Sequence, residues 1–175
     1  MPGIKYFPEN LNIENKTLIL RLDLNVPLEN KEIQDDTRLS IVIPFLNNLV
    51  KRKAKIIIIS HLGRPKESRD ETLSLIPVYK YLKKQMHCNM YFFTGDINQE
   101  LKNKCSFLKS GEIILLENIR FNKGESENDD AFANKLADLG EIYVNDAFSC
   151  SHRKQASIHN ITKFVKKSFA GPLLK

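Results

Sequence analysis

Arginine side chains follow three of the apolar runs in this sequence, at Arg64, Arg120 and Arg153. A guanidinium group carries a planar fork of N–H donors that matches phosphate oxygens two at a time. A single arginine after a strand is usually an ordinary surface residue. Three of them gathered at one place would repel one another unless an anion lay between them. The pattern therefore predicts a phosphate-type ligand.

The stretch IIIISHLGRP, residues 56–65, is an apolar run that ends directly in polar side chains. His61 and Arg64 flank a short segment that contains Gly63. A glycine at such a place indicates either a positive φ or a close approach of the backbone to a ligand. A lone histidine is more often structural. Ser60 and His61 do not form a nucleophile pair, because adjacent side chains on extended backbone point apart.

Arg38 lies in the segment QDDTRLS, residues 34–40, where Asp36 or Thr37 is a suitable helix N-cap. The predicted helix then carries a cation in its first turn, where the helix dipole disfavours positive charge by about 0.3–1 kcal/mol. Two interpretations are open. The position is incidental, or Arg38 and the amides of the helix N-terminus face the same anion.

Asp23 and Asn25 follow the first apolar run, in the segment RLDLNVPL at residues 21–28. Both residue types form turns by bonding their own backbone. Both also offer polar groups to a ligand that reaches the end of the run. The residues alone leave these two interpretations open.

The elements that position these side chains are predicted from hydrophobic periodicity. Apolar runs typical of buried strands lie at residues 17–23, 55–60, 90–93, 112–117 and 141–146. Most are continuous rather than alternating, which indicates a parallel sheet covered on both faces. Segments with helical spacing lie at residues 39–50, 73–86 and 129–139. This alternation predicts an α/β fold, a Rossmann-like three-layer α/β/α arrangement with a mostly parallel sheet.

Ligands of open parallel sheets bind outside the carboxyl ends of the strands, so the polar segments are expected to meet at one edge. Two segments fit the pattern less well. Pro44 interrupts the first helical pattern, so that helix is expected to kink or to begin later. The tail, residues 157–175, is expected to begin as a mixed segment and to stop without a cap, with the sheet continuing in residues that this chain lacks.

The 175-residue chain is 42% hydrophobic and 27% charged, as is usual for one soluble globular domain. No apolar stretch approaches the ~18 residues of a membrane span. Residues 1–10 lack the pattern of a signal peptide, so a cytosolic location is expected. The net charge of +6 favours an anionic partner. Composition leaves open whether that partner is a nucleic acid, a membrane or a small phosphate.

Cysteine, glycine and histidine patterns indicate whether disulfides, nucleotide-binding loops or metal sites are expected. Cys88, Cys105 and Cys150 form no CxxC pair, and their odd number argues against a disulfide framework, so free thiols are expected. The sequence contains no GxxxxGKS/T or GxGxxG phosphate loop, no HExxH motif and no metal-ligand spacing. Neither a nucleotide site nor a metal site is therefore expected in this chain.

Several segments together resemble the phosphoglycerate kinase family, in its order and at its spacing. They are RLDLNVPL (21–28), DDTR (35–38), SHLGRP (60–65), LLENIRF (115–121) and VNDAFSCSHRKQAS (144–157). The resemblance covers essentially the whole chain. It implies that residues 1–175 form the N-terminal, substrate-binding domain of a two-domain kinase, and that the C-terminal nucleotide-binding domain is absent from this chain.

The resemblance implies reversible phosphoryl transfer from 1,3-bisphosphoglycerate to ADP, giving 3-phosphoglycerate and ATP in glycolysis. Mg²⁺ would accompany the nucleotide on the missing half, and the family is monomeric, with no nucleic acid or membrane partner. The implied ligands of the 3-phosphate are Arg64, Arg120 and Arg153. The residues implied to orient the hydroxyl and carboxyl end are Asp23, Asn25 and His61, and the implied substrate-binding segments also include Leu24, Leu62 and Gly63. Arg38 would be catalytic, because it would face the phosphoryl group during transfer.

Two departures from the family pattern concern the last motif. Ser149–Cys150 replace a pair of small residues, often Gly-Thr, and Gln155 stands where a second histidine is common. These departures put in doubt the hydrogen bonds that the resemblance implies around the substrate carboxylate, but not the contacts to the substrate phosphate. Two alternatives to the kinase half are a stand-alone anion-binding module and a basic nucleic-acid-binding domain.

Overall fold

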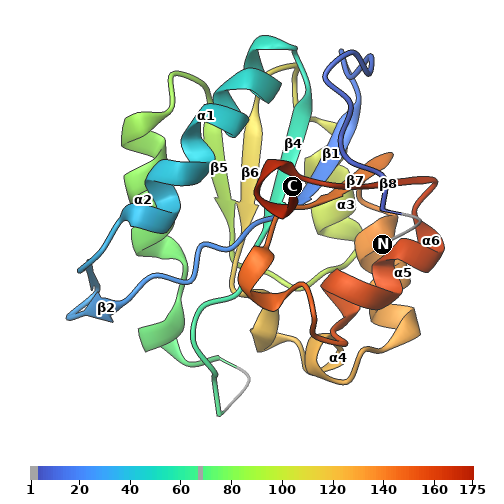
Figure 1. The fold of residues 1–175 in the computed structure, drawn as a ribbon. Helices are drawn as coiled ribbons and strands as arrows, with labels where there is room; N and C mark the ends of the chain where they lie inside the picture. Colours follow the sequence, from blue (N-terminus) through green and yellow to red (C-terminus); the bar gives the residue numbers. More distant parts are fainter. Residues whose placement is uncertain (1–3, 67–68) are drawn as a thin grey trace.

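The apolar runs of the sequence pair into one sheet at the centre of the molecule (Figure 1). The computed structural model describes residues 4–66 and 69–175. The strands of the sheet are β1 (Thr17–Arg21), β4 (Lys55–Ile59), β5 (Met90–Phe93), β6 (Ile113–Leu116), β7 (Ile142–Asn145) and β8 (Lys167–Ala170). They lie in the order β5-β6-β4-β1-β7-β8, and each neighbouring pair is parallel.

Helices cover both faces of this sheet (Figure 1). One face packs against α1 (Thr37–Lys51) and α2 (Ile76–Gln85), and the other against α3 (Gln99–Ser106), α5 (Asp130–Ala137) and α6 (Ile161–Phe164). Successive strand residues alternate between the two cores, as Leu18 and Ile19 show. Both faces of the central strands are therefore buried, which explains their continuous apolar runs. The predicted three-layer α/β/α fold is confirmed.

Shorter elements occupy the connections. β2 (Leu28–Glu29) and β3 (Glu32–Ile33) form an antiparallel hairpin, and α4 (Lys123–Ser126) is a single helical turn. Turns of 3-10 helix lie at Glu71–Leu73, Ile119–Phe121, Phe148–Cys150 and Pro172–Leu174, and a π-helical turn at Ala156–Asn160. The five predicted strands are confirmed, and four of them are shorter than the apolar runs, so their last polar residues belong to loops.

The first helix was expected to kink at Pro44 or to begin later, and the later beginning was wrong. Helix α1 begins at Thr37 and continues through Pro44 to Lys51. Proline removes the N–H that would bond the Ser40 carbonyl, but both residues are exposed, so water can satisfy that carbonyl. Four buried apolar residues, Leu39, Val42, Leu46 and Leu49, keep the helix on the sheet.

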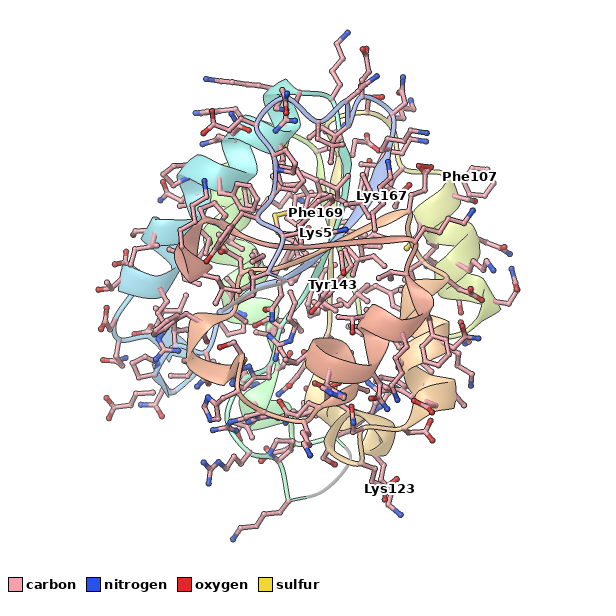
Figure 2. All side chains as sticks on the ribbon, turned by 45° about the vertical axis from the view of Figure 1, so that its right-hand side comes forward. Lys5, Phe107, Lys123, Tyr143, Lys167 and Phe169 are labelled. Atoms are coloured by element: carbon pink, nitrogen blue, oxygen red, sulfur yellow. The ribbon has the colours of Figure 1, made fainter. Side chains whose placement is uncertain are left out.

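The tail of the chain contains a strand that the sequence pattern did not indicate. β8 pairs with β7, and on its other side Tyr6 forms a parallel bridge to Ala170. The Phe7 amide donates to the Ala170 carbonyl at 2.9 Å, and the Ala170 amide donates to the Lys5 carbonyl at 2.8 Å. Figure 2 shows Lys5 close to Phe169 and Lys167 at this margin. The N-terminal segment therefore covers the edge of the sheet.

The remaining sequence expectations concern thiols and membranes. The three cysteines are free, as predicted, and burial raises the pKa of Cys105 to about 12. Within residues 4–66 and 69–175, no helix combines the length and the hydropathy that a membrane span requires.

Candidate anion-binding site

Four loops meet where the parallel strands end. Their residues are 22–26 after β1, 60–64 after β4, 117–120 after β6 and 146–153 after β7; we call them the site loops. The strands end almost in register, because Arg21 pairs with Ile59 on one side and with Asn145 on the other. The site loops therefore start at the same level, at the lower end of the sheet in Figure 1. This is the arrangement that the sequence predicted.

Asp23 joins three segments at this edge. Its Oδ2 accepts a hydrogen bond from Arg38 Nη1 at 2.5 Å and another from the Ser149 hydroxyl. Its Oδ1 accepts from the Asn25 amide at 3.3 Å. Burial raises the pKa of Asp23, but the Ser149 hydrogen bond, the Arg38 charge and the Asn25 amide lower it by more, so the pKa falls below its usual value. Asp23 is therefore an ionised acceptor at neutral pH.

Arg38 lies in the first turn of α1, as predicted, and its side chain is 45% exposed. Asp36 occupies the N-cap position, but it is the Asp35 carboxylate that accepts from the Thr37 amide, at 2.9 Å. The first turn of α1 contains no acidic residue that would offset the charge of Arg38. The guanidinium is held by Asp23 alone among the described residues, and it keeps free N–H groups that face solvent.

Gly63 is fixed between two of the predicted site residues. Its amide donates to Asn25 Oδ1 at 2.8 Å, and its carbonyl accepts from Arg120 Nη1 at 2.6 Å. Its φ is +58°, and an added Cβ would lie 2.6 Å from Leu73 Cδ2. The positive φ that the sequence suggested is therefore present.

Asn118 organises the loop after β6, and sequence reasoning assigned it no role. Its Oδ1 accepts from the amides of Leu62 and Arg120, at 3.2 and 3.1 Å. Its Nδ2 donates to the carbonyls of Leu62 and Leu73, at 2.7 and 3.0 Å. The side chain is fully buried, and the two bonds to Leu62 are buried with it, whereas those to Leu73 and Arg120 are partly buried. The available signal was an asparagine directly before a short helical turn, a typical capping position.

Leu24 and Leu62 serve the site through their backbone. Both side chains are buried in the core. The Leu24 amide donates to the Ser60 hydroxyl at 3.0 Å, which joins the loop after β1 to the loop after β4. These leucines thus fix the loop positions and offer no side chain to a ligand.

Arg21 is a second site residue that sequence reasoning missed. It is the last residue of β1, and its side chain is completely buried. Its Nη2 lies 3.1 Å from His61 Nδ1. Burial, followed by the charges of Arg21 and Arg120, lowers the pKa of His61 to about 3. His61 is therefore a neutral imidazole at pH 7.

The three predicted phosphate ligands differ in setting. Arg64 is exposed and Arg153 is half-buried. Burial and then the charge of Arg153 lower the pKa of Arg120, so these two cations lie close enough to repel. Arg120 Nη2 is buried and has no hydrogen-bond partner among the described residues. The structure thus brings Arg120, Arg153 and His61 into one positive region, and it shows no contact that draws Arg64 into it within residues 4–66 and 69–175.

This arrangement suits a small oxyanion with further polar groups. Cations of the site loops lie near one another, and an anion would relieve their repulsion. Asp23 offers an acceptor, and Asn25 is engaged in shaping the Gly63 turn. Within residues 4–66 and 69–175, no group of three or more His, Cys, Asp or Glu side chains is placed to hold a metal ion.

Comparisons with known proteins agree with these motifs. The family model described as phosphoglycerate kinase matches residues 9–175. A phosphoglycerate kinase from Wolbachia sp. subsp. Drosophila simulans is 48% identical over 163 residues, which is 93% of this chain and 40% of that protein. A phosphoglycerate kinase from Desulforapulum autotrophicum is 45% identical over 166 residues, 94% of this chain and 42% of that protein.

Solved structures show the same fold. Phosphoglycerate kinase from Coxiella burnetii superposes with a TM-score of 0.86 at 39% identity, over 94% of this chain and 41% of that one. The enzyme from Pyrococcus horikoshii superposes with a TM-score of 0.83 at 29% identity, over 97% and 43%. The chain thus spans about two fifths of the length of the proteins it matches. On the family match and these identities, the chain belongs to the phosphoglycerate kinase family.

Proposed function

We propose that this chain binds the acid substrate of a phosphoglycerate kinase. The complete enzyme would transfer a phosphoryl group reversibly from 1,3-bisphosphoglycerate to ADP, giving 3-phosphoglycerate and ATP. The observation that carries the proposal is the meeting of Arg120, Arg153 and the Asp23–Arg38 pair at one edge of the sheet. Unbalanced cations beside an ionised acceptor suit a ligand that carries both a phosphate and a hydroxyl group.

Arg64, Arg120 and Arg153 hold the 3-phosphate in this proposal. Arg120 already directs Nη1 to the Gly63 carbonyl, and its buried Nη2 has no partner among the described residues, so a phosphate oxygen that reached it would satisfy this donor. Arg64 is exposed, so it can close over the phosphate from the solvent side. Phosphate binding would relieve the repulsion between Arg120 and Arg153.

Asp23, Asn25 and His61 orient the other end of the substrate. The ionised Asp23 accepts from the substrate hydroxyl, and the neutral His61 donates to an oxygen of the hydroxyl or carboxyl end. Asn25 acts mainly by fixing Gly63, to which it is bonded at 2.8 Å. The substrate-binding segments are completed by the backbone of Leu24 and Leu62.

Arg38 is the catalytic residue of this proposal. Phosphoryl transfer depends on positioning and on stabilising charge at the transferring oxygens. Arg38 is half-exposed and lies at the N-terminus of α1, so its free N–H groups and the helix dipole can act on the same oxygens. A preorganised donor of this kind typically lowers the barrier by about 2.7–4 kcal/mol.

The nucleotide belongs, in this proposal, to the part of the relatives that this chain does not span. Mg²⁺ with ADP or ATP would bind there as co-substrate, and closure of the two domains would bring the substrates into line away from water. Residues 1–175 would then bind 3-phosphoglycerate as a monomer in the cytoplasm but would not transfer phosphate alone.

Calorimetric or NMR titration of this chain tests the proposal. We expect weak binding of 3-phosphoglycerate and no specific binding of ATP. Arg64→Ala should weaken 3-phosphoglycerate binding. Arg69→Ala is the matched control, because Arg69 is an exposed arginine of the same connection that pairs with Asp96 at 3.0 Å. A folded chain that binds ATP tightly, or that does not bind 3-phosphoglycerate, would contradict the proposal.

The same titration separates the two alternatives. A stand-alone anion-binding module would bind inorganic phosphate as well as 3-phosphoglycerate. A nucleic-acid-binding domain would bind oligonucleotides with an affinity that falls steeply with salt, since each neutralised phosphate releases counterions. We expect 3-phosphoglycerate to bind more tightly than inorganic phosphate, because Asp23 and His61 would add contacts beyond the phosphate group. We expect no oligonucleotide binding, because the cations that carry the proposal lie in one small region of the sheet edge.

A further inference from the structure

A row of buried polar side chains leads from the interior of the molecule to His61. Arg21, Ser157 and Glu125 are each 0% exposed. A buried cation is expensive unless it is paired and hydrogen-bonded. Arg21 has no direct ion pair with a carboxylate within the described residues, so its charge is balanced through an intermediate group.

Ser157 is that group. Its hydroxyl accepts from Arg21 Nε at 2.9 Å and donates to Glu125 Oε1 at 2.6 Å. Its amide donates to Glu125 Oε2 at 2.8 Å, so both oxygens of the carboxylate are used. A serine hydroxyl has one proton, and the direction of these bonds is therefore fixed by the cation on one side and the anion on the other.

The backbone of Ser157 is held as well. Tyr143 donates its hydroxyl to the Ser157 carbonyl at 2.6 Å, and Tyr143 is itself 1% exposed. Figure 2 shows Tyr143 in the middle of the molecule. Ser157 lies in the π-helical turn Ala156–Asn160, a form of backbone that is frequent at functional sites. The serine thus cannot move without breaking several buried bonds.

The guanidinium of Arg21 passes this constraint to His61. Its Nη1 donates to the Leu22 carbonyl at 2.6 Å, and its Nη2 lies 3.1 Å from His61 Nδ1. Arginine has donors only. Nδ1 of His61 must therefore be the acceptor, and the proton of the neutral ring must lie on Nε2.

We propose that Glu125, Ser157 and Arg21 form a positioning relay that holds His61 as the neutral Nε2–H tautomer, so that this histidine meets its ligand as a hydrogen-bond donor and not as a cation. The nature of that ligand, a hydroxyl or carboxyl oxygen, rests on the proposed function. The tautomer rests only on the contacts within the protein. Glu125 and Ser157 touch no ligand in this proposal and act through Arg21.

The charges that face His61 come from each of the packed elements around it. Arg21 lies on β1, Asp23 in the loop after it, Arg120 after β6, and Arg153 after β7. The cations outnumber the one carboxylate, which also favours the neutral ring. No amide, hydroxyl or carboxylate of the described residues bonds to His61 Nε2, so this N–H is available.

NMR of the histidine ring nitrogens in the ¹⁵N-labelled, ligand-free chain tests the relay. The signals of His61 are assigned with the His61→Gln variant. We expect the Nε2–H tautomer alone, unchanged between pH 5 and 8. An Nδ1–H tautomer, or protonation within this range, would overturn the proposal. Because no ligand is present, this result is independent of whether 3-phosphoglycerate binds.

Variants of the relay test its role. Ser157→Ala removes the acceptor of Arg21 Nε and should yield a mixture of both tautomers at His61. Ser151→Ala is the matched control, because Ser151 is an exposed serine of the same segment whose hydroxyl bonds only the Phe148 carbonyl among the described residues. Glu125→Gln keeps the shape of the side chain and should give the same mixture if the alanine variant does not fold. A folded Ser157→Ala or Glu125→Gln protein that keeps a single Nε2–H tautomer would overturn the relay.

Discussion

Arg38 and Arg21 lie at the same edge of the sheet but differ widely in how much of their side chains is exposed to solvent. Arg38 is 45% exposed and is held by one carboxylate, that of Asp23. Arg21 is completely buried and donates to Ser157, Leu22 and His61. The difference indicates a division of labour. The buried arginine holds neighbouring groups of the site loops in place, whereas the more exposed one is free to take a further partner in the proposed reaction.

Replacing Arg21 should have the largest effect. Arg21→Leu leaves the Glu125 carboxylate buried without the cation that balances it through Ser157, and leaving a buried charge uncompensated costs about 3–5 kcal/mol. Urea denaturation measures the free energy of unfolding. Arg69→Leu is the control, since an exposed pair contributes about 0–1 kcal/mol. A loss in Arg21→Leu as small as in the control would show that Arg21 has no structural role.

Replacing Arg38 tests the other half of the comparison. In the complete enzyme, Arg38→Ala should lower kcat by about 10²–10³-fold, the usual effect of removing a preorganised donor. Binding of 3-phosphoglycerate should weaken far less, and stability should fall only modestly, because Arg38 is 45% exposed and Asp23 keeps its hydrogen bonds from Ser149 and the Asn25 amide. Lys51→Ala, at the opposite end of α1, is the control for a lost positive charge. Equal losses in turnover and binding would make Arg38 a ground-state anchor.

The charge state of His61 should appear in the dependence of stability on pH. Its pKa is about 3 in the folded protein and near 6.5 in a solvated chain, so the unfolded state binds more protons between these values. Stability should therefore fall as the pH drops below about 6.5, with a slope of up to ~1.4 kcal/mol per pH unit from this residue.

His61→Gln should remove that part of the slope, and denaturation between pH 7 and 4.5 measures it. His152→Gln is the control, because His152 is exposed and belongs to the same site loops. An unchanged slope in His61→Gln would mean that His61 is protonated in the folded protein, and the contrast between buried and exposed groups at this edge would be lost.

Replacing Gly63 should have the smallest effect of these substitutions, and it tests how far binding depends on the backbone conformation of the site loops. Gly63→Ala and Gly111→Ala both place an alanine at positive φ, which costs about 1–2 kcal/mol. Only Gly63 is bonded to Asn25 and Arg120. Gly63→Ala should lose somewhat more stability, because its Cβ would lie 2.6 Å from Leu73 Cδ2 whereas that of Gly111→Ala would approach no atom closer than 3.5 Å. Only Gly63→Ala should weaken 3-phosphoglycerate binding. Equal binding by the two variants would separate the Gly63 turn from the site.

Much of the fold follows from local pattern, and the exceptions are non-local. The isoleucine run of β4 identifies a central strand because both of its faces are buried. β8, KSFA, carries little apolar character, and its strand conformation is set by pairing with β7 and with the segment around Tyr6. No property of residues 167–170 alone reveals partners that lie so far away in the sequence. Helix α1 tolerates Pro44 because exposure, a tertiary property, allows it.

The site residues divide in the same way, into those that local sequence pattern reveals and those that only tertiary contacts define. Residue type and position after a strand were enough to single out Arg120, Arg153 and His61, and a cation in the first turn of a predicted helix singled out Arg38. Arg21 escaped notice because a charged residue inside an apolar run gives no sign of whether it is buried. Asn118 escaped because three of its four bonds depend on how its loop packs against the connection between β4 and α2. The roles assigned to these residues toward a substrate stay predictions until binding is measured.

The bridge between Tyr6 and Ala170 affects the order in which the protein can form during synthesis. Residues 5–7 leave the ribosome long before their hydrogen-bond partners on β8, because the other five strands of the sheet lie between them in the sequence. The opening segment must therefore remain unpaired while the sheet grows outward from β1 and β4, and contacts so distant in sequence form slowly. The covering of the sheet margin by this segment would then be among the last steps in the folding of this domain.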